Sequence, residues 1–209
     1  MPFIKSIAVG GINTIPTGIT TDGKYLWWCG VTGSNIYQID KSGNLIRTIA
    51  VGGIDAQPHG ITFDGKYLWF VGRENLSIYQ IDKTGNLIST IAVGGIDIAP
   101  TGLTFDGKYL WWVGATNKII IQMSKAGNLI RTIAVGGIDG NPSGITTDGK
   151  YLWMTGTNND RIYQLDKSGN LIRNIAVGAT DGSPIGITTD GKYLWWTGNQ
   201  FDQIVQWAK

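Results

Sequence analysis

Five polar residues recur at one spacing and could together form a metal site. Asp55, Asp97, Asp139 and Asp181 stand 42 residues apart, and Asn13 stands 42 residues before Asp55. If these side chains meet, they present a ring of oxygen atoms, which suits Ca²⁺ or Mg²⁺. Each side chain can instead accept hydrogen bonds within its own turn. We favour this second interpretation. We therefore predict no metal ion and no other cofactor, and keep the four aspartates as candidates for binding a ligand.

The chain has a single histidine, His59, whose type could serve in acid–base chemistry. The other repeats have Thr17, Thr101, Ser143 and Ile185 at this position, so no recurring partner is defined. No Ser–His–Asp order can be assigned, and the sequence contains no phosphate-binding loop, HExxH or CxxC motif. We expect a protein that is not an enzyme, and we regard His59 as a candidate ligand-binding residue.

Two segments of each repeat vary and are candidates for recognition. One precedes a recurring proline and contains the four aspartates. The other follows an invariant glycine and reads VTGSN, RENLS, ATNKI, TNNDR and NQFDQ in the five repeats. Loops held on a rigid scaffold carry function, so Arg73, Asn117 and Asn159 of this second segment join the candidates. The alternative is that both segments vary because nothing constrains them.

The elements that must position these residues are short strands. Four are expected in the first repeat, at residues 18–20, 24–28, 36–40 and 45–51, and their equivalents follow every 42 residues. A DG pair between the first two strands indicates a hairpin, and Gly43 suits a bulged turn between the last two. No stretch has a helical period over ten residues. Four antiparallel strands in each of five repeats predict an all-β fold, the five-bladed β-propeller.

The ends of the chain predict how the ring closes. The repeats span 7–48, 49–90, 91–132, 133–174 and 175–209 plus 1–6, which makes residues 1–209 one domain. The last repeat has only three strands at the C-terminus, and residues 3–9 align with the fourth strand of the other repeats. We expect this N-terminal strand to complete the last blade, and we expect a monomer. The alternative is part of a larger ring that another chain completes.

The hairpin turns divide the loops between two rims of the expected ring. The TDGK and DKSGN turns lie on one rim, which we call the constant rim because its sequence barely changes. The two varying segments lie on the opposite rim, which we call the variable rim. The variable rim carries seven acidic and three basic residues, which predicts an acidic surface for cations or basic partners. A ligand or a protein partner is expected on this rim.

The nine tryptophans are expected to be core. One position of the repeat is always tryptophan, at Trp27, Trp69, Trp111, Trp153 and Trp195. The next position reads Trp28, Phe70, Trp112, Met154 and Trp196, so it requires an apolar volume and no specific ring. Alternation along a strand sends the two positions to opposite faces, each covered by a neighbouring blade. The competing interpretation is a fivefold aromatic ligand site.

Residues 16–28 (PTGITTDGKYLWW) and 36–46 (IYQIDKSGNLI) resemble the blades of NHL, YVTN and streptogramin-lyase-like propellers. The resemblance covers all 209 residues and implies a blade, not an activity. Those families include protein-interaction modules, ligand binders and a lyase type. The lyase-like members are generally seven-bladed and use a histidine as acid and base.

Composition limits the remaining function classes. A net charge of +2 does not favour a nucleic-acid partner. The sequence contains no run of 18 apolar residues, so we expect no membrane span. The N-terminus lacks the pattern of a signal peptide, so a cytoplasmic location is expected over a secreted one. The prediction is a non-catalytic binding or interaction scaffold. Its similar repeats also fit a recently amplified or engineered protein without an evolved ligand. The alternatives are a multivalent lectin with equivalent sites between blades and, less favoured, a streptogramin-lyase-like enzyme.

Overall fold

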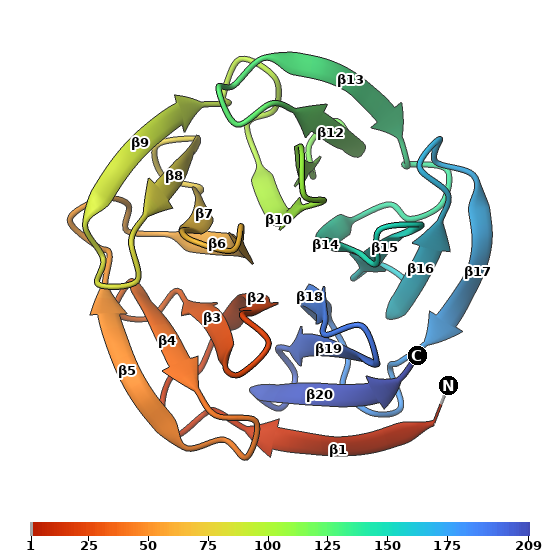
Figure 1. The fold of residues 1–209 in the computed structure, drawn as a ribbon. Coiled ribbons are helices and arrows are strands. Elements are labelled where there is room, and N and C mark those ends of the chain that lie inside the picture. The colour runs from red at the N-terminus through yellow and green to blue at the C-terminus, as the bar shows by residue number, and fades with distance from the viewer. Residues whose placement is uncertain (1) are drawn as a thin grey trace.

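The computed structural model describes residues 2–209, which form a closed ring of five four-stranded antiparallel blades (Figure 1). We name the blades A to E in ring order. Blade A is β2–β5, blade B is β6–β9, blade C is β10–β13, blade D is β14–β17, and blade E is β18–β20 with β1. The predicted five-bladed propeller is confirmed. The described part of the chain contains no helix and hence none that could cross a membrane.

The strands occupy four positions from the centre of the ring outward. The innermost strands are β2 (Pro16–Thr21), β6 (Pro58–Phe63), β10 (Pro100–Phe105), β14 (Pro142–Thr147) and β18 (Pro184–Thr189). The second strands are β3 (Leu26–Gly30), β7 (Leu68–Gly72), β11 (Leu110–Gly114), β15 (Leu152–Gly156) and β19 (Tyr193–Gly198). The third strands are β4 (Asn35–Ile39), β8 (Ser77–Ile81), β12 (Ile119–Met123), β16 (Arg161–Leu165) and β20 (Gln203–Ala208). The outer strands are β1 (Phe3–Ala8), β5 (Leu45–Ala50), β9 (Leu87–Ala92), β13 (Leu129–Ala134) and β17 (Leu171–Ala176).

The N-terminal strand closes the ring as the sequence predicts. Strand β1 pairs antiparallel with β20, from Phe3 opposite Trp207 to Ala8 opposite Gln203. Figure 1 shows both termini at the outer side of blade E, beside blade D. The last blade therefore contains the same four strand positions as the others, although its strands come from the two ends of the chain.

Turn chemistry explains where the hairpins reverse. Gly43 has a φ of +102°, and the β4–β5 register shifts between Gln38 and Ile39, which confirms the bulged turn. The turn between β2 and β3 spans residues 22–25, two more than the DG pair alone. The Asp22 carboxylate accepts the peptide N–H groups of Lys24 and Tyr25, which removes these donors from the ladder.

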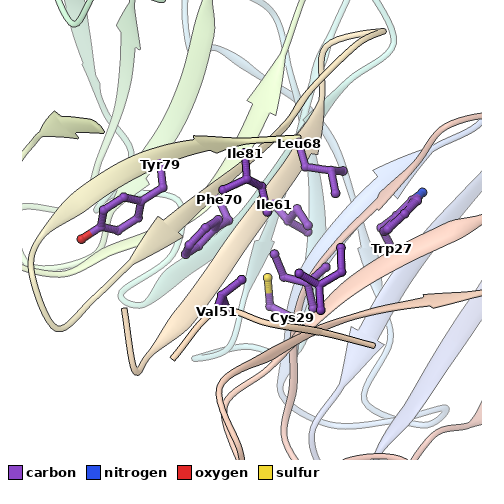
Figure 2. Packing of buried hydrophobic residues seen from close by; sticks show 10 residues of the cluster. Trp27, Cys29, Val51, Ile61, Leu68, Phe70, Tyr79 and Ile81 are labelled. Atoms are coloured by element: carbon purple, nitrogen blue, oxygen red, sulfur yellow. The ribbon is translucent and has the colours of Figure 1, made fainter. Parts of the chain in front are cut away.

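The hydrophobic core lies in the five seams between neighbouring blades. Figure 2 shows the seam between blades A and B, where Trp27 and Cys29 of blade A meet Leu68, Phe70 and Ile81 of blade B. The two tryptophan positions point to opposite seams. Trp27 lies in this A–B seam, and its neighbour along the strand, Trp28, lies in the seam between blades E and A. The core interpretation of the tryptophans is confirmed, since both are at most 1% exposed.

The innermost strands pack so closely that only glycine fits at one position of each. A Cβ atom on Gly18 would lie 2.1 Å from the carbonyl oxygen of His59 in the next blade. The last contact closes the circle, because a Cβ on Gly186 would lie 2.2 Å from the carbonyl oxygen of Thr17. Gly60, Gly102 and Gly144 make the same approach. The channel is correspondingly narrow, with a central cavity of about 10 Å³, the volume that one water molecule requires.

Candidate functional site at the channel mouth of the variable rim

On the constant rim, polar side chains join neighbouring blades. Asp22 accepts hydrogen bonds from the peptide N–H of Tyr25 at 2.8 Å and from the indole Nε1–H of Trp27 at 3.1 Å, both in its own blade. Lys83 of the next blade donates to the same carboxylate at 2.9 Å and lies 5.7 Å above the Trp27 ring. The invariant tryptophan therefore has a hydrogen-bonding role in addition to its volume.

The ion pair repeats at all five seams. The ion pairs are Lys83 with Asp22, Lys125 with Asp64, Lys167 with Asp106, Lys209 with Asp148, and Lys41 with Asp190. Burial alone would raise the pKa of Asp148, but hydrogen bonds from Lys209 and from the Tyr151 peptide lower it to about 2. The carboxylates of this rim are already bound within the protein, which makes the rim a structural element.

The four recurring aspartates of the variable rim are buried inside their own blades. Asp55 is 1% exposed, and its carboxylate accepts the peptide N–H groups of Gln57 at 2.9 Å and Asn75 at 3.0 Å. The hydroxyl of Tyr79 lies 3.4 Å from the same carboxylate. A Cβ on Gly72 would lie 2.3 Å from the Asp55 carboxyl carbon, which explains the invariant glycine. The hydrogen bonds match the interpretation that the side chain caps its own turn.

Asp97, Asp139 and Asp181 occupy the same position and are at most 1% exposed. They form no exposed ring of oxygen atoms at the channel mouth. Within the described residues, no group of three or more His, Cys, Asp or Glu side chains could hold a metal ion. We therefore assign the four aspartates, Asp55 included, a structural role and do not carry them into the binding site proposed below.

Burial withdraws these four carboxylates from direct contact with a ligand. The other acidic residues of the rim, Glu74, Asp160 and Asp202, are matched in number by its three basic residues, Arg73, Lys118 and Arg161. That the rim attracts cations or basic partners stays a prediction.

Asp181 differs from its equivalents. Tyr79 and Tyr163, whose hydroxyls face Asp55 and Asp139, are replaced by Ile121 in blade C and by Val205 in blade E. Asp97 of blade C still accepts the Asn117 peptide N–H on its Oδ2 at 2.7 Å. The Oδ2 atom of Asp181 has no hydrogen-bond partner in residues 2–209, and burial raises the pKa of this carboxyl. Because Asp181 is fully buried, we interpret it as a local loss of stability and not as a site.

Asn117 and Asn159 lie exposed on the variable rim and hold its loops. The Asn117 amide donates to the carbonyl oxygen of Ile96 at 3.1 Å. The Asn159 amide donates to the carboxylate of Asp139 at 3.1 Å. Neither residue lines a cavity at the channel mouth, so the structure separates them from the two remaining candidates.

His59 and Arg73 meet in a cavity of about 290 Å³. Pro58 is the first residue of β6 and His59 is the second, so His59 lies at the variable-rim end of this innermost strand. Arg73 directly follows Gly72, the last residue of β7. An Arg73 Nη1 atom lies 3.3 Å from His59 Nε2. The cavity lies across the channel mouth, because its other walls come from blades C, D and E. They are Thr101, Ala115, Asn141, Pro142, Ser143, Thr157, Ser183 and Ile185.

The protonation of His59 follows from its surroundings. Burial and then the positive charge of Arg73 lower the pKa of His59 to about 3. The ring is therefore neutral at pH 7. Since Arg73 carries only donors, Nε2 accepts its hydrogen bond and we assign the proton to Nδ1. Arg73 forms no ion pair with any carboxylate of residues 2–209.

Blade B, which carries His59 and Arg73, departs from the pattern of the other repeats. At the other four seams a threonine hydroxyl reaches a carbonyl oxygen of the next blade. These threonines are Thr17, Thr101, Thr155 and Thr197. Blade B has His59 and Val71 at the two positions that supply such a threonine elsewhere. The seam between blades B and C thus lacks this hydrogen bond, and the substitution of His59 for threonine places an imidazole in the channel mouth.

Comparison with known proteins identifies the fold. No protein-family model and no curated protein sequence matches the chain significantly. The structure of Myxococcus xanthus glutaminyl cyclase matches with a TM-score of 0.76 at 13% identity, over 98% of this chain and 94% of that chain. Virginiamycin B lyase from Staphylococcus aureus matches with a TM-score of 0.61 at 22% identity, over 94% and 67% of the two chains.

A chain of the nidogen–laminin complex also matches, with a TM-score of 0.67 at 17% identity, over 92% of this chain and 75% of that chain. Such low identities show a shared fold alone. The lyase among these neighbours is consistent with the resemblance of the repeats to streptogramin-lyase-like blades. The chain is similar in fold to enzymes and to a protein of the nidogen–laminin complex, so the fold by itself does not select a function.

Proposed function

We propose that this protein is a non-catalytic binding propeller that takes one small ligand at the mouth of its channel. The observation that carries the proposal is the cavity of about 290 Å³ that brings together His59 and Arg73. It lies where the repeat pattern is broken, and it contains a cation without a carboxylate partner. The polar groups of the constant rim and the buried aspartates are already bound within the protein.

The chemistry of the cavity supports binding over catalysis. A histidine with a pKa of about 3 is a weak base at neutral pH, where general bases work best with a pKa near the operating pH. Its Nε2 already accepts from Arg73. The lining contains hydroxyl groups but no carboxylate that could orient the imidazole, so it does not provide the third member of a Ser–His–Asp arrangement.

A fragment screen by NMR on the labelled protein tests this proposal. We expect fragments that bind to shift the resonances of His59, Thr101 and Ser143, in a ratio of one per chain, and to be recovered unchanged after a day. The His59 ring is a clean probe because the chain has one histidine. Turnover of a fragment, or shifts confined to the constant-rim turns, would contradict the proposal.

The alternative is a multivalent lectin, and one observation favours it. Five equivalent tyrosines stand half-buried on the constant rim, each with a lysine nitrogen 4.7–5.0 Å from the ring centre. They are Tyr25, Tyr67, Tyr109, Tyr151 and Tyr193. A glycan array, followed by titration of any hit, separates the two functions because the lectin predicts five equivalent sites and the channel mouth predicts one.

A further inference from the structure

We propose that the cavity at the channel mouth binds a small organic carboxylate, whose anionic group pairs with Arg73. This inference rests on the proposed function and names the chemical class of its ligand. Arg73 is the charged residue of a lining that otherwise consists of hydroxyl, amide, imidazole and apolar groups. An anion is the ligand that such a lining selects, since no wall of the cavity carries a negative side chain.

The guanidinium of Arg73 has donors to spare. It has five N–H groups, and the structure gives it one side-chain partner, the acceptor Nε2 of His59. A planar carboxylate fits the remaining fork with two parallel hydrogen bonds. The other two basic residues of this rim differ, because Arg161 donates to the side chain of Asn174 and Lys118 packs along Gly136. Neither of them lines the cavity.

The neutral state of His59 sets the charge that the cavity accepts. A protonated imidazole beside Arg73 would make a site for a doubly charged group. The neutral ring leaves one positive charge, which suits one carboxylate better than a phosphate dianion or a diphosphate. The neighbouring hydroxyl groups of Ser143 and Ser183 lie in the same lining and supply further donors.

The remaining walls indicate the body of the ligand. Ala115, Pro142 and Ile185 give the cavity an apolar side. A volume of about 290 Å³ is at the lower end of small-molecule sites. The ligand class is therefore a monocarboxylate with a compact apolar body, such as an aromatic or branched aliphatic acid.

Isothermal titration and the His59 ring signal test the inference, with benzoate as the probe, at pH 7 and low salt. Benzamide, which has the same ring and no charge, serves as the matched ligand control. We expect benzoate to bind at one site and to shift the His59 signal, and benzamide to bind at least tenfold more weakly. Inorganic phosphate at the same concentration should bind more weakly than benzoate.

Matched variants locate the charge that matters. Arg73→Gln should weaken benzoate binding at least tenfold, and Arg73→Lys should restore part of it. Arg161→Gln and Lys118→Gln remove one charge each from the same rim outside the cavity, and benzoate should bind to both within twofold of the original. A thermal melt of each variant verifies that it is folded.

Several outcomes overturn the inference. These are no binding of benzoate, equal binding of benzoate and benzamide, tighter binding of phosphate, and an unchanged affinity in the folded Arg73→Gln variant. If the fragment screen finds only neutral ligands at His59 and no carboxylate, the proposed function stands and the carboxylate inference fails. If fragments bind elsewhere on the ring, both fail.

Discussion

The two rims of the ring each carry a set of aspartates that recurs with the repeat, in five blades on the constant rim and in four on the variable rim, and the two sets bind different kinds of partner. On the constant rim, Asp64 binds the indole of Trp69 in its own blade and the ammonium of Lys125 in the next blade. On the variable rim, Asp97 binds the peptide N–H groups of Ala99 and Asn117, both in its own blade. One set joins blades through side chains, and the other folds a single blade through its backbone.

This difference explains which rim keeps its sequence. A change in a constant-rim turn removes a side chain that two blades share. On the variable rim most donors are peptide groups, which every residue except proline supplies, so the loop can change its side chains and keep its conformation. The variable rim can therefore accept a residue such as Arg73 at little cost in stability, and this is where recognition can develop.

The largest effect is expected between the two rims, where the innermost strands pack against each other around the channel. Gly102→Ala would place a Cβ 2.5 Å from the carbonyl oxygen of Ser143 in the next blade. Because that atom belongs to the backbone, the blades must move apart, and we expect a loss of at least about 4 kcal/mol of unfolding free energy. The control is Gly137→Ala, where the new methyl group meets nothing within 4 Å. Chemical denaturation measures both, and equal stabilities would refute the close packing of the ring.

The second prediction compares one aspartate from each rim of blade D. Asp139→Ala removes the acceptor of the buried Tyr163 hydroxyl and of the Asn141 peptide N–H, and should cost about 3 kcal/mol. Asp148→Ala removes the partner of Trp153 and Lys209 on the constant rim and should cost about 2 kcal/mol.

Hydrogen exchange distinguishes the two changes by their location. Asp139→Ala should speed exchange only in the loops of blade D. Asp148→Ala should also affect β20 of blade E, which ends beside Lys209. Identical exchange patterns would show that the aspartates on the two rims do not differ in the way their hydrogen bonds indicate.

The two tryptophan positions provide a smaller test. The Nε1–H of Trp111 donates to Asp106 at 2.8 Å, so Trp111→Phe removes a hydrogen bond to a carboxylate and should cost about 2 kcal/mol. The Nε1 atom of Trp112 is buried without a partner in the described chain, and Phe70 already stands at the equivalent position. Trp112→Phe should therefore cost less than about 1 kcal/mol. Urea titrations of both variants check the ranking, which a reversed order would contradict.

Strong acid should weaken the ion pairs of the constant rim. Burial alone would raise the pKa of Asp64, but hydrogen bonds from Lys125 and from the Tyr67 peptide lower it to about 2. A lowered carboxyl pKa contributes stability that is present above the ordinary value of 3.8 and is lost as the pH falls through about 2. Melting temperatures between pH 5 and pH 2 should fall, and the fall should be smaller in Asp64→Asn. An equal fall in that variant would exclude Asp64 as a cause.

The sequence predicts the parts of this structure that follow from period and alternation. A repeat of 42 residues with strand-length apolar runs gives the blades, and alternation along 24–28 sends Trp27 and Trp28 to different seams. The match of residues 3–9 to the fourth strand predicts how the ring closes. The sequence also predicts that His59 and Arg73 lie on the same rim, because both stand in or beside the loops that are expected there.

Other features depend on contacts between parts of the chain that the 42-residue spacing of the repeats does not predict. The pair of Asp22 with Lys83 joins two different repeats, so no motif within one repeat contains it. The invariant Gly18 reflects the small radius of a five-bladed ring, which brings the innermost backbones into contact. The burial of Asp55 depends on the path of the loop at 73–75, whose peptide groups face the carboxylate. A recurring aspartate in a sequence looks the same whether it faces solvent or its own backbone.

The smallest effect is expected at the seam between blades B and C. At the outer strand, Arg131 binds Gln122 of its own blade and the carbonyl oxygen of Lys167 in the next blade. Ser89 is the equivalent residue in blade B and reaches only Gln80 of its own blade. Ser89→Arg should recover the contact with the next blade and raise the unfolding free energy by about 0.5 kcal/mol.

The matched control for this change is Ser89→Gln, which is long and polar but lacks the guanidinium that bridges two blades. Differential scanning calorimetry at low and high salt compares the two variants. The gain in Ser89→Arg should persist at high salt, since the acceptor is a peptide carbonyl and not a carboxylate. If Ser89→Gln stabilises the protein as much, the gain comes from packing on the outer strand, and the blade B–C seam is not deficient in cross-blade hydrogen bonds.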